Sequence, residues 1–373
     1  MPATPIPFTG VDRHFRAHQA QFLALTQKTL THGKVLQGPE VAEFEGKLCA
    51  LAGRKHAVAV GSCTDALAFA LMAHGIGPGD EVLVTGLSFF ASVSCILRVG
   101  ATPRFVDVQA GTAMMDLDRL EGLVGPRTRA LLAVHLYGQC LPMERVEAFA
   151  ARHRLLLLED AAQAIGATWQ GRPAGSMGRI SCFSFDPTKV VGCFGSAGAV
   201  LTDEQAVAEK VRRLRYHGQD PASGRFEHLG FNSQLSSEYA GHLSYKLSLL
   251  PGWLVRREAI AQAYLEGLAG LPDLALPERV PGSTHNWHKF VIRTPERERL
   301  KQRLAGAGIA TMVHYALPLD REPAVAALGL GTAALPVAEE LCRTVLSLPI
   351  FPEMTEDEVA QVVEAVRAAF VTA

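Results

Sequence analysis

Short apolar runs alternate with segments of helical spacing through the first two thirds of the chain. The run at 56–60, HAVAV, is typical of a buried strand, and the helical segment after it spans 62–74. The same strand-then-helix order recurs further along the chain. Such alternation favours parallel strands, because a parallel crossover needs a connection long enough to hold a helix. We therefore expect an α/β fold whose mainly parallel sheet spans residues 56 to 215, with helices on both faces.

The flanking stretches carry patterns of their own. Further helices are predicted over 11–34, from Pro39 onward and over 236–250. A loop is predicted over 217–232, and strands are predicted over 288–293 and 345–350. Pro251-Gly252 is interpreted as a hinge, because proline inside a helix removes a backbone hydrogen bond. The pattern predicts a large domain at 1–250 and a smaller C-terminal α+β domain at 251–373.

Charge and composition exclude several classes of protein. The chain has 373 residues and a formal net charge of −1, so we expect no partner nucleic acid and no anionic membrane. No apolar run reaches the roughly 18 to 20 uncharged residues of a membrane span. The seven cysteines include no CxxC pair and are typical of reduced thiols in a cytoplasmic protein. No metal site is expected either, because the spaced pair His14 and His18 is more typical of a solvated helix face.

Two acids end the most apolar strand of the chain. Four leucines at 155–158 are followed by Glu159 and Asp160, at the carboxyl end of the predicted strand. Ligands of open α/β sheets bind beyond the carboxyl ends of parallel strands. A buried carboxylate is costly there unless a cation pairs with it, so Asp160 is a candidate functional residue, with a helix cap as the alternative. Gln163 is expected to share its face.

One lysine lies in unusually apolar surroundings. Lys189 follows Cys182, Phe183 and Phe185 and precedes a glycine-rich turn. An ammonium in such surroundings loses its proton more readily, so the amine is a candidate for Schiff-base chemistry. The alternative is a surface lysine of which only the alkyl stem is buried.

A small-residue turn at 61–64 opens the first helix of the alternating region. Backbone N–H groups and the dipole at such a helix start suit a phosphate, although ordinary capping also explains Ser62 and Thr64. Phe89 stands at the end of the next strand, where an aromatic ring can cover a planar ligand or belong to the core.

Taken together, eight segments resemble the DegT/DnrJ/StrS family of pyridoxal-phosphate-dependent sugar aminotransferases. The resemblance covers about residues 33 to 366 and depends on the order and spacing of the segments. They are GPEVAEFE at 38–45, VGSCTDALAFAL at 60–71, GIGPGDEV at 75–82, VHLYGQ at 134–139, EDAAQAIGA at 159–167, FSFDPTK at 183–189, GFNSQLSS at 230–237 and LPIFPEMTEDE at 348–358. It implies the PLP-dependent transferase fold type I, the fold of aspartate aminotransferase.

The resemblance also implies roles for single residues around pyridoxal 5'-phosphate. Lys189 would form the Schiff base with the cofactor aldehyde, and Asp160 would lie against the pyridine nitrogen. The other implied cofactor contacts are Gln163 at the ring hydroxyl, Phe89 over the ring face, and Ser62, Cys63, Thr64 and Ser184 around the phosphate. Asn232 would reach the cofactor phosphate of the partner subunit in a homodimer with shared sites. His217 and Tyr315 fall at motif positions near the site.

The implied reaction is a ping-pong transamination. The family usually takes the amino group from L-glutamate, sometimes from L-glutamine, and gives it to a keto sugar, most often a nucleotide-linked keto-deoxyhexose. Relatives that act as sugar dehydrases lack the lysine, so the presence of Lys189 predicts amino transfer. Some 4-amino-sugar enzymes carry histidine at the position of Gln163, which favours a 3-keto sugar or an aminocyclitol here.

Three positions depart from the family pattern. Cys63 replaces a usual glycine, which would narrow the phosphate turn or place a thiol near the cofactor. Gln234 replaces an arginine associated with anion binding and offers neither its charge nor its two-pronged geometry. Asp320 replaces the last histidine of an HYxxPLH motif. His217, Gln234, Tyr315 and Asp320 are therefore the candidate substrate-binding residues.

Three other functions are considered. The chain could transaminate a free keto-cyclitol or another polyol ketone, if Gln234 means that no diphosphate is bound. A nicotinamide-dependent reductase is disfavoured, because the turn at Gly61 has no GxGxxG fingerprint. A non-catalytic binding protein of the same fold would fit the changes at Gln234 and Asp320, whereas Asp160, Ser184 and Lys189 argue against it.

Overall fold

A seven-stranded sheet forms the centre of the protein in a computed structural model that describes residues 5–330 and 333–371. The outer ends of the two predicted domains, 1–4 and 372–373, lie outside these ranges. In spatial order the strands are β1 (His56–Val60), β9 (Gly198–Thr202), β8 (Ile180–Ser184), β5 (Leu156–Asp160), β4 (Thr128–Val134), β2 (Glu81–Thr85) and β3 (Thr102–Val106). β9 runs antiparallel to both of its neighbours, and the remaining neighbours pair in parallel. The predicted α/β fold with a mainly parallel sheet is confirmed.

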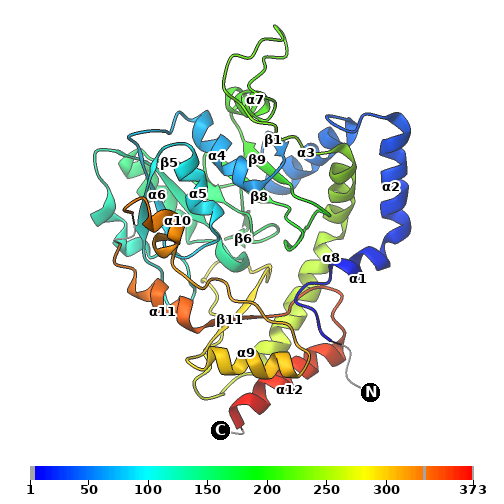
Figure 1. The fold of residues 1–373 in the computed structure, drawn as a ribbon, viewed down its shortest axis with the longest axis vertical. Helices are drawn as coiled ribbons and strands as arrows, with labels where there is room; N and C mark the ends of the chain where they lie inside the picture. Colours follow the sequence, from blue (N-terminus) through cyan, green and yellow to red (C-terminus); the bar gives the residue numbers. More distant parts are fainter. Residues whose placement is uncertain (1–4, 331–332, 372–373) are drawn as a thin grey trace.

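Helices surround this sheet and connect its strands (Figure 1). They are α1 (Val11–Ala17), α2 (Gln19–His32), α3 (Pro39–Ala52), α4 (Cys63–Ala73), α5 (Ala91–Arg98), α6 (Met143–His153), α7 (Gln205–Leu214), α8 (Ser237–Gly267), α9 (Arg297–Gly306), α10 (Pro323–Ala326), α11 (Pro336–Thr344) and α12 (Glu356–Val371), with short 3-10 turns η1 (Leu117–Arg119), η2 (Glu121–Leu123), η3 (Leu136–Gly138) and η4 (Leu319–Arg321). α4 contacts β1, β8 and β9 and also both α5 and α7, so these three helices form one layer. None of the helices in the described part of the chain is long and apolar enough to cross a membrane.

Local sequence explains where several of these elements begin. Pro39 occupies the first turn of α3, where its missing N–H has no intrahelical acceptor anyway. Ser62 caps α4, since its side-chain oxygen accepts a hydrogen bond of 3.1 Å from the backbone N–H of Asp65. The residues of β5 are buried throughout, which explains the unbroken run of leucines.

The predicted hinge at Pro251-Gly252 is wrong. α8 continues through Pro251 and spans 31 residues in one helix. Its first part contacts α2 and α3, and it also contacts α12, so Figure 1 shows it running from the large sheet to the C-terminal helix. Proline removes one hydrogen bond inside a helix. Packing on both sides of Pro251 compensates for that loss, and the helix does not end.

A second hydrophobic core lies below the sheet region. It surrounds the antiparallel pair β10 (Phe290–Arg293) and β11 (Val345–Leu348), as expected for an α+β unit. Tyr264 of α8 is fully buried in it, and Ile6 joins it from the N-terminal end. A separate two-stranded ribbon consists of β6 (Thr168–Trp169) and β7 (Arg172–Pro173). The division at residue 250 stays a prediction, because α8 belongs to both cores.

Candidate active site

A cavity of about 480 Å³ lies where the carboxyl ends of three parallel strands meet. Val134, Asp160 and Ser184, the last residues of β4, β5 and β8, all line it. The cavity also contacts the first turns of α4 and α5 and the segment 312–315. Of the predicted site residues it brings together Ser62, Cys63, Thr64, Phe89, Asp160, Gln163, Ser184, Lys189 and Tyr315. The position follows the rule for open α/β sheets.

Asp160 is one of two acids that line this cavity, the other being Asp186. One carboxylate oxygen accepts a 2.9 Å hydrogen bond from Ser92 Oγ, and the other accepts one of 3.2 Å from the backbone N–H of Ala162. Ser92 Oγ is also 2.9 Å from Ser88 Oγ. Burial raises the pKa of Asp160, and the hydrogen bond from Ser92 opposes that rise by stabilising the charged form. A carboxylate held in this way can pair with a cationic ring nitrogen.

Glu159 has a different task from its neighbour. Successive residues of a strand point to opposite faces, and Glu159 is fully buried away from the cavity. Its carboxylate accepts hydrogen bonds from the backbone N–H groups of Gly175 and Met177, at 2.8 and 2.6 Å. It also bonds to His135 Nε2 at 3.0 Å. Glu159 therefore anchors the turn before β8, whereas Asp160 serves the cavity.

Lys189 lies in a short turn that follows β8. Its backbone N–H donates to Asp186 O at 2.9 Å, and the carboxylate of Asp186 accepts from Thr188 N and Oγ1. Burial lowers the pKa of Lys189, and the nearby Asp160 carboxylate opposes that effect. The structure thus places Lys189 in the wall of the cavity, which argues against the alternative of a surface lysine.

The first turn of α4 forms another part of the cavity wall. Ser62, Cys63 and Thr64 line it there, together with Ser184 and Ser196. A Cβ atom on Gly198 would lie 2.5 Å from Cys63 N, so glycine in β9 lets this turn sit against the sheet. Hydroxyls and free backbone N–H groups at a helix start suit a phosphate. Cys63 places a thiol in the wall, and burial raises its pKa, so that the thiol stays protonated.

Gln163 connects the sheet side of the cavity to the segment 312–315. Its side-chain nitrogen donates to Tyr315 OH at 3.1 Å, and its oxygen accepts from Tyr137 N at 2.8 Å. The ring of Phe89 is 54% exposed and its centroid lies 6.2 Å from that of Tyr315. Phe89 therefore does not belong to the hydrophobic core. A planar ligand in the cavity would contact the rings of Phe89 and Tyr315 on this side.

Three predicted residues lie outside the cavity of their own chain. His217, Asn232 and Gln234 belong to the loop after α7 and its continuation, which projects from the body in Figure 1. His217 and Asn232 are exposed, and Gln234 accepts a hydrogen bond from Gln37. Ser233, which lies between Asn232 and Gln234 in sequence, connects this segment to the start of α4. Its Oγ accepts a hydrogen bond from Gly61 N and donates one to Asp65. The single chain therefore brings none of these three residues to the cavity.

Asp320 is buried rather than directed at the cavity. It is fully buried, and within residues 5–330 and 333–371 its carboxylate oxygens accept no hydrogen bond. Arg321 Nε lies 3.5 Å from Asp320 Oδ2, and burial raises the pKa of the acid. Asp320 is not among the cavity-lining residues, so the structure gives its predicted substrate contact no support.

The sequence interpretation missed several residues of the site. Ser88 bonds to Ser92, and Ser92 in turn donates to Asp160; the i, i+4 spacing of the two serines after β2 was a usable signal. His288, Lys289 and His314 also line the cavity. Burial lowers the pKa of His314 to about 3 and that of Lys289 to about 7. The segment 288–289 lies far along the chain, and no local pattern placed it here.

The chain is similar to known sugar transaminases over almost its whole length. The DegT/DnrJ/EryC1/StrS aminotransferase family matches residues 17–367. The dTDP-3-amino-3,4,6-trideoxy-alpha-D-glucose transaminase of Streptomyces venezuelae is 40% identical, over 97% of this chain and 95% of the relative. The UDP-N-acetyl-3-dehydro-alpha-D-glucosamine 3-aminotransferase of Acidithiobacillus ferrooxidans is 38% identical, over 98% of both. The crystal structure of S. venezuelae DesV in complex with a ketimine intermediate superposes with a TM-score of 0.95, at 40% identity over 98% of both chains.

Pyridoxal 5'-phosphate fits the donor groups of this cavity. Solved structures of similar proteins hold PLP or its amino form, PMP. The chain offers an amine in Lys189, a carboxylate in Asp160, and hydroxyl and N–H donors at the start of α4. These are the partners that an aldehyde, a pyridine nitrogen and a phosphate require. With fold, site and sequence in agreement, the chain is a PLP-dependent aminotransferase of fold type I that belongs to the DegT/DnrJ/EryC1/StrS family.

Proposed function

We propose that this chain transfers an amino group from L-glutamate or L-glutamine to a 3-keto sugar linked to a nucleotide, by ping-pong transamination. The observation that carries the proposal is the meeting of Lys189 and Asp160 in one cavity at the sheet edge. The names of the two relatives specify a 3-amino or 3-dehydro sugar on a nucleotide, which supports the acceptor. Gln163, at a position where some 4-amino-sugar enzymes carry histidine, supports the same choice.

Each residue has a defined task in this reaction. When bound, pyridoxal phosphate supplies an aldehyde that takes up the amino group and a ring that accepts electrons from the α-carbon. The amine of Lys189 would hold the cofactor and, when free, would act as the base that takes the proton from the donor α-carbon. Asp160 would pair with the protonated ring nitrogen. Tyr315 OH, held by Gln163, lies in the same cavity, where it can orient the substrate.

The test separates the two half-reactions. PLP-loaded protein is mixed with L-glutamate alone, and the visible band of the lysine-bound cofactor is expected to fade as PMP forms. Addition of a dTDP- or UDP-linked 3-keto sugar should restore the band, whereas a free keto-cyclitol should not. A band that fades only with L-glutamine would identify the other donor. Restoration by the cyclitol, or no response to either amino acid, would contradict the proposal.

Ser92→Ala is expected to weaken cofactor binding about ten-fold. The hydroxyl of Ser92 stabilises the charged form of Asp160, so its loss raises the pKa of that acid further and weakens its pairing with the ring nitrogen. Equilibrium binding of PLP at pH 7 provides the measurement. Ser94→Ala is the matched control, since Ser94 Oγ donates to Ala91 O on the same helix and Ser94 does not line the cavity. Equal affinity in both variants would show that Ser92 does not act on the cofactor.

A homodimer with shared active sites is part of this proposal. The loop after α7 projects outward and exposes several large apolar side chains, namely Tyr216, Phe226, Leu229 and Phe231. Leu229 is 93% exposed, which is unfavourable in water unless another surface covers it. A second subunit covering this loop would bring Asn232 to the cofactor phosphate of its neighbour.

Asn232→Ala is expected to weaken cofactor binding about ten-fold without changing the thermal unfolding of the apoprotein. The side chain is exposed in the single chain, so its removal disturbs no core. PLP affinity and melting temperature are measured together, and His228→Ala, an exposed change in the same loop, is the control. An unchanged PLP affinity would argue against the shared site.

A further inference from the structure

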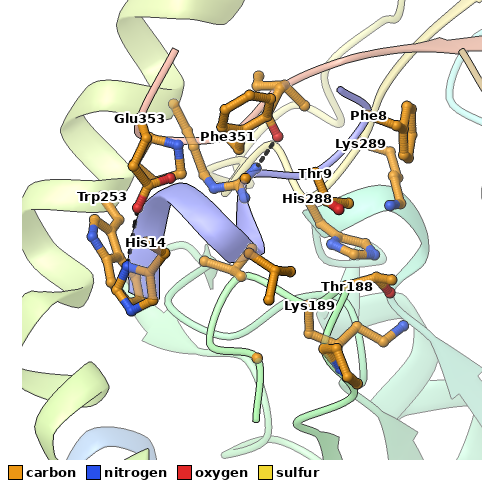
Figure 2. A pocket seen from close by; sticks show the side chains of 18 of the residues that line it. Phe8, Thr9, His14, Thr188, Lys189, Trp253, His288, Lys289, Phe351 and Glu353 are labelled. Atoms are coloured by element: carbon orange, nitrogen blue, oxygen red, sulfur yellow. Dashed lines mark hydrogen bonds and ion pairs between the residues drawn. The ribbon is translucent and has the colours of Figure 1, made fainter. Parts of the chain in front are cut away.

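A second cavity adjoins the active-site cavity. It has a volume of about 60 Å³ and shares Thr188, Lys189, His288 and Lys289 with the larger one. Figure 2 shows it between the segment with Phe8 and Thr9, α1 with His14, Trp253 of α8, and the C-terminal loop with Phe351 and Glu353. The turn that carries Lys189 thus separates two cavities.

The unusual feature of this second cavity is its charge. Among the residues that the structure describes, four lysine or arginine residues are buried, namely Arg54, Lys246, Arg257 and Lys289. Arg54 pairs with Asp203 at 2.8 Å and lies 3.7 Å from Glu159. The other three line the second cavity, and within the described ranges none is in ion-pair contact with a carboxylate. Buried cations are normally paired with acids.

Neutral groups contact each of these three cations, and for Lys289 the contact is the ring of Phe8, whose centroid lies 4.7 Å from Lys289 Nζ. Lys246 Nζ donates to Gly192 O at 2.6 Å and lies 3.9 Å from the ring centroid of Phe194. Arg257 Nη1 donates to the carbonyls of Trp287 and Ile350, at 2.8 and 3.0 Å. Carbonyl dipoles and aromatic faces stabilise a cation only in part. None of these partners neutralises the positive charge.

Arg257 and His288, which both line this cavity, each have a side-chain nitrogen that can still bind a ligand. Within the described chain, the buried Nε of Arg257 and Nδ1 of His288 have no hydrogen-bond partner. Buried donors without partners are rare in native proteins and point to a ligand or ion. The nitrogen of Arg257 is a permanent donor, because guanidinium does not lose its proton in proteins.

The wall contains one acid, Glu353, whose charge raises the pKa of Lys246 and of Arg257 from beyond ion-pair distance. Glu353 Oε1 lies 3.0 Å from His14 Nδ1, as the dashed line in Figure 2 indicates. Burial lowers the pKa of Lys246 to about 8 and that of Lys289 to about 7, and neighbouring Lys189 and Arg257 add to the effect on Lys289. A negative charge in the cavity would reverse these shifts.

We propose that this cavity, lined by Lys246, Arg257 and Lys289, is a binding site for a small monovalent anion. A cavity needs roughly 10 to 15 Å³ to hold one water, so a halide or a planar oxyanion such as bicarbonate fits, whereas a large organic anion does not. The inference is independent of the proposed substrates. Because Lys189 lines the same cavity, the bound anion also favours the protonated form of Lys189.

The location of the site is tested with bromide. Crystals of the PLP-loaded protein are soaked in bromide, and anomalous scattering is expected to show an ion beside Lys246, Arg257 and Lys289. Competition with bicarbonate should reduce that peak if oxyanions share the site, and an unchanged peak would restrict the site to halides. Bromide at surface positions only, with none in this cavity, would overturn the proposal.

Two variants with opposite expected effects test the same site in solution. Affinity is measured as the rise in melting temperature when bromide replaces gluconate, which is too large for the cavity, at constant ionic strength. Lys246→Met is expected to weaken bromide binding roughly ten-fold. Glu353→Gln is expected to strengthen it several-fold, because a repelling charge is lost while the hydrogen bond to His14 can remain.

Lys210→Met is the matched control. Lys210 Nζ also donates to a backbone carbonyl, that of Ala73, but it lies outside the cavity. This variant should bind bromide like the unmodified protein. If Lys246→Met fails to fold, the gain expected in Glu353→Gln still decides the question. Equal bromide affinity in Glu353→Gln and the unmodified protein would overturn the assignment of the anion to this cavity.

Discussion

Lys189→Ala is expected to reduce the rate of amino transfer by roughly 10³-fold or more and to remove the visible band of the lysine-bound cofactor. Lys189 is the lysine of the cavity that stands beside Asp160, and burial already lowers its pKa toward the neutral amine. Without it, neither the covalent attachment nor the proton transfer from the donor α-carbon has a group to perform it. Absorbance of the PLP-loaded variant and single-turnover rates with L-glutamate provide the measurement.

Two controls distinguish chemistry from damage to the fold. Lys210→Ala removes a lysine of similar length that donates to Ala73 O away from the cavity, and it should keep both band and rate. In Lys189→Ala, a small primary amine added to the solution should restore part of the rate, because it replaces the missing base. Full turnover by Lys189→Ala without added amine would contradict the assignment.

Glu159→Ala is expected to lower the free energy of unfolding by about 3 to 5 kcal/mol at pH 7. The substitution leaves the N–H groups of Gly175 and Met177 and the ring of His135 without their buried acceptor. Urea unfolding measures the loss. Glu147→Ala breaks the surface ion pair with Arg172 and should cost less than about 1 kcal/mol. A loss in Glu159→Ala no larger than in this control would contradict the anchoring role.

The stabilisation by Glu159 also has an expected pH dependence. Burial by itself would raise the pKa of Glu159, but the hydrogen bonds from His135, Gly178 and Gly175 hold it below its ordinary value. A carboxyl with a lowered pKa in the folded state stabilises the fold above its unfolded pKa of about 4.3, and loses that contribution as the pH falls through the folded value. The difference between Glu159→Gln and the unmodified protein should therefore shrink below about pH 4. A difference that stays constant from pH 7 to acid would show that the charge of Glu159 is not responsible.

Much of the catalytic centre was predictable because its residues stand at strand ends. Asp160 and Ser184 end β5 and β8, and Lys189 follows β8 by a short turn. The carboxyl ends of parallel strands lie at the same edge of a sheet. Residues at those positions can therefore be predicted to lie near one another before the rest of the fold is known. The helix start at Ser62 was predictable for a similar reason, since its cap is local.

Distant segments decide other features, and the prediction at Pro251 failed for that reason. Pro251 reads as a hinge by local rules, but packing of α8 against α2, α3 and α12 keeps the helix continuous. Asp320 belongs to a motif that suggests substrate contact, and yet it is buried outside the lining of the cavity. Neither result could be obtained from the residues nearby in sequence.

The sequence by itself determined the fold class and the family and singled out Lys189 and Asp160 as candidate catalytic residues, because strand and helix patterns and short motifs are local properties of the chain. Only the tertiary structure decided that Glu159 is an anchor, that Ser92 supports Asp160, and that Lys246, Arg257 and Lys289 meet in one cavity. These groups come from segments far apart in sequence. Their interactions depend on burial and on distances between atoms, which exist only after the chain has folded.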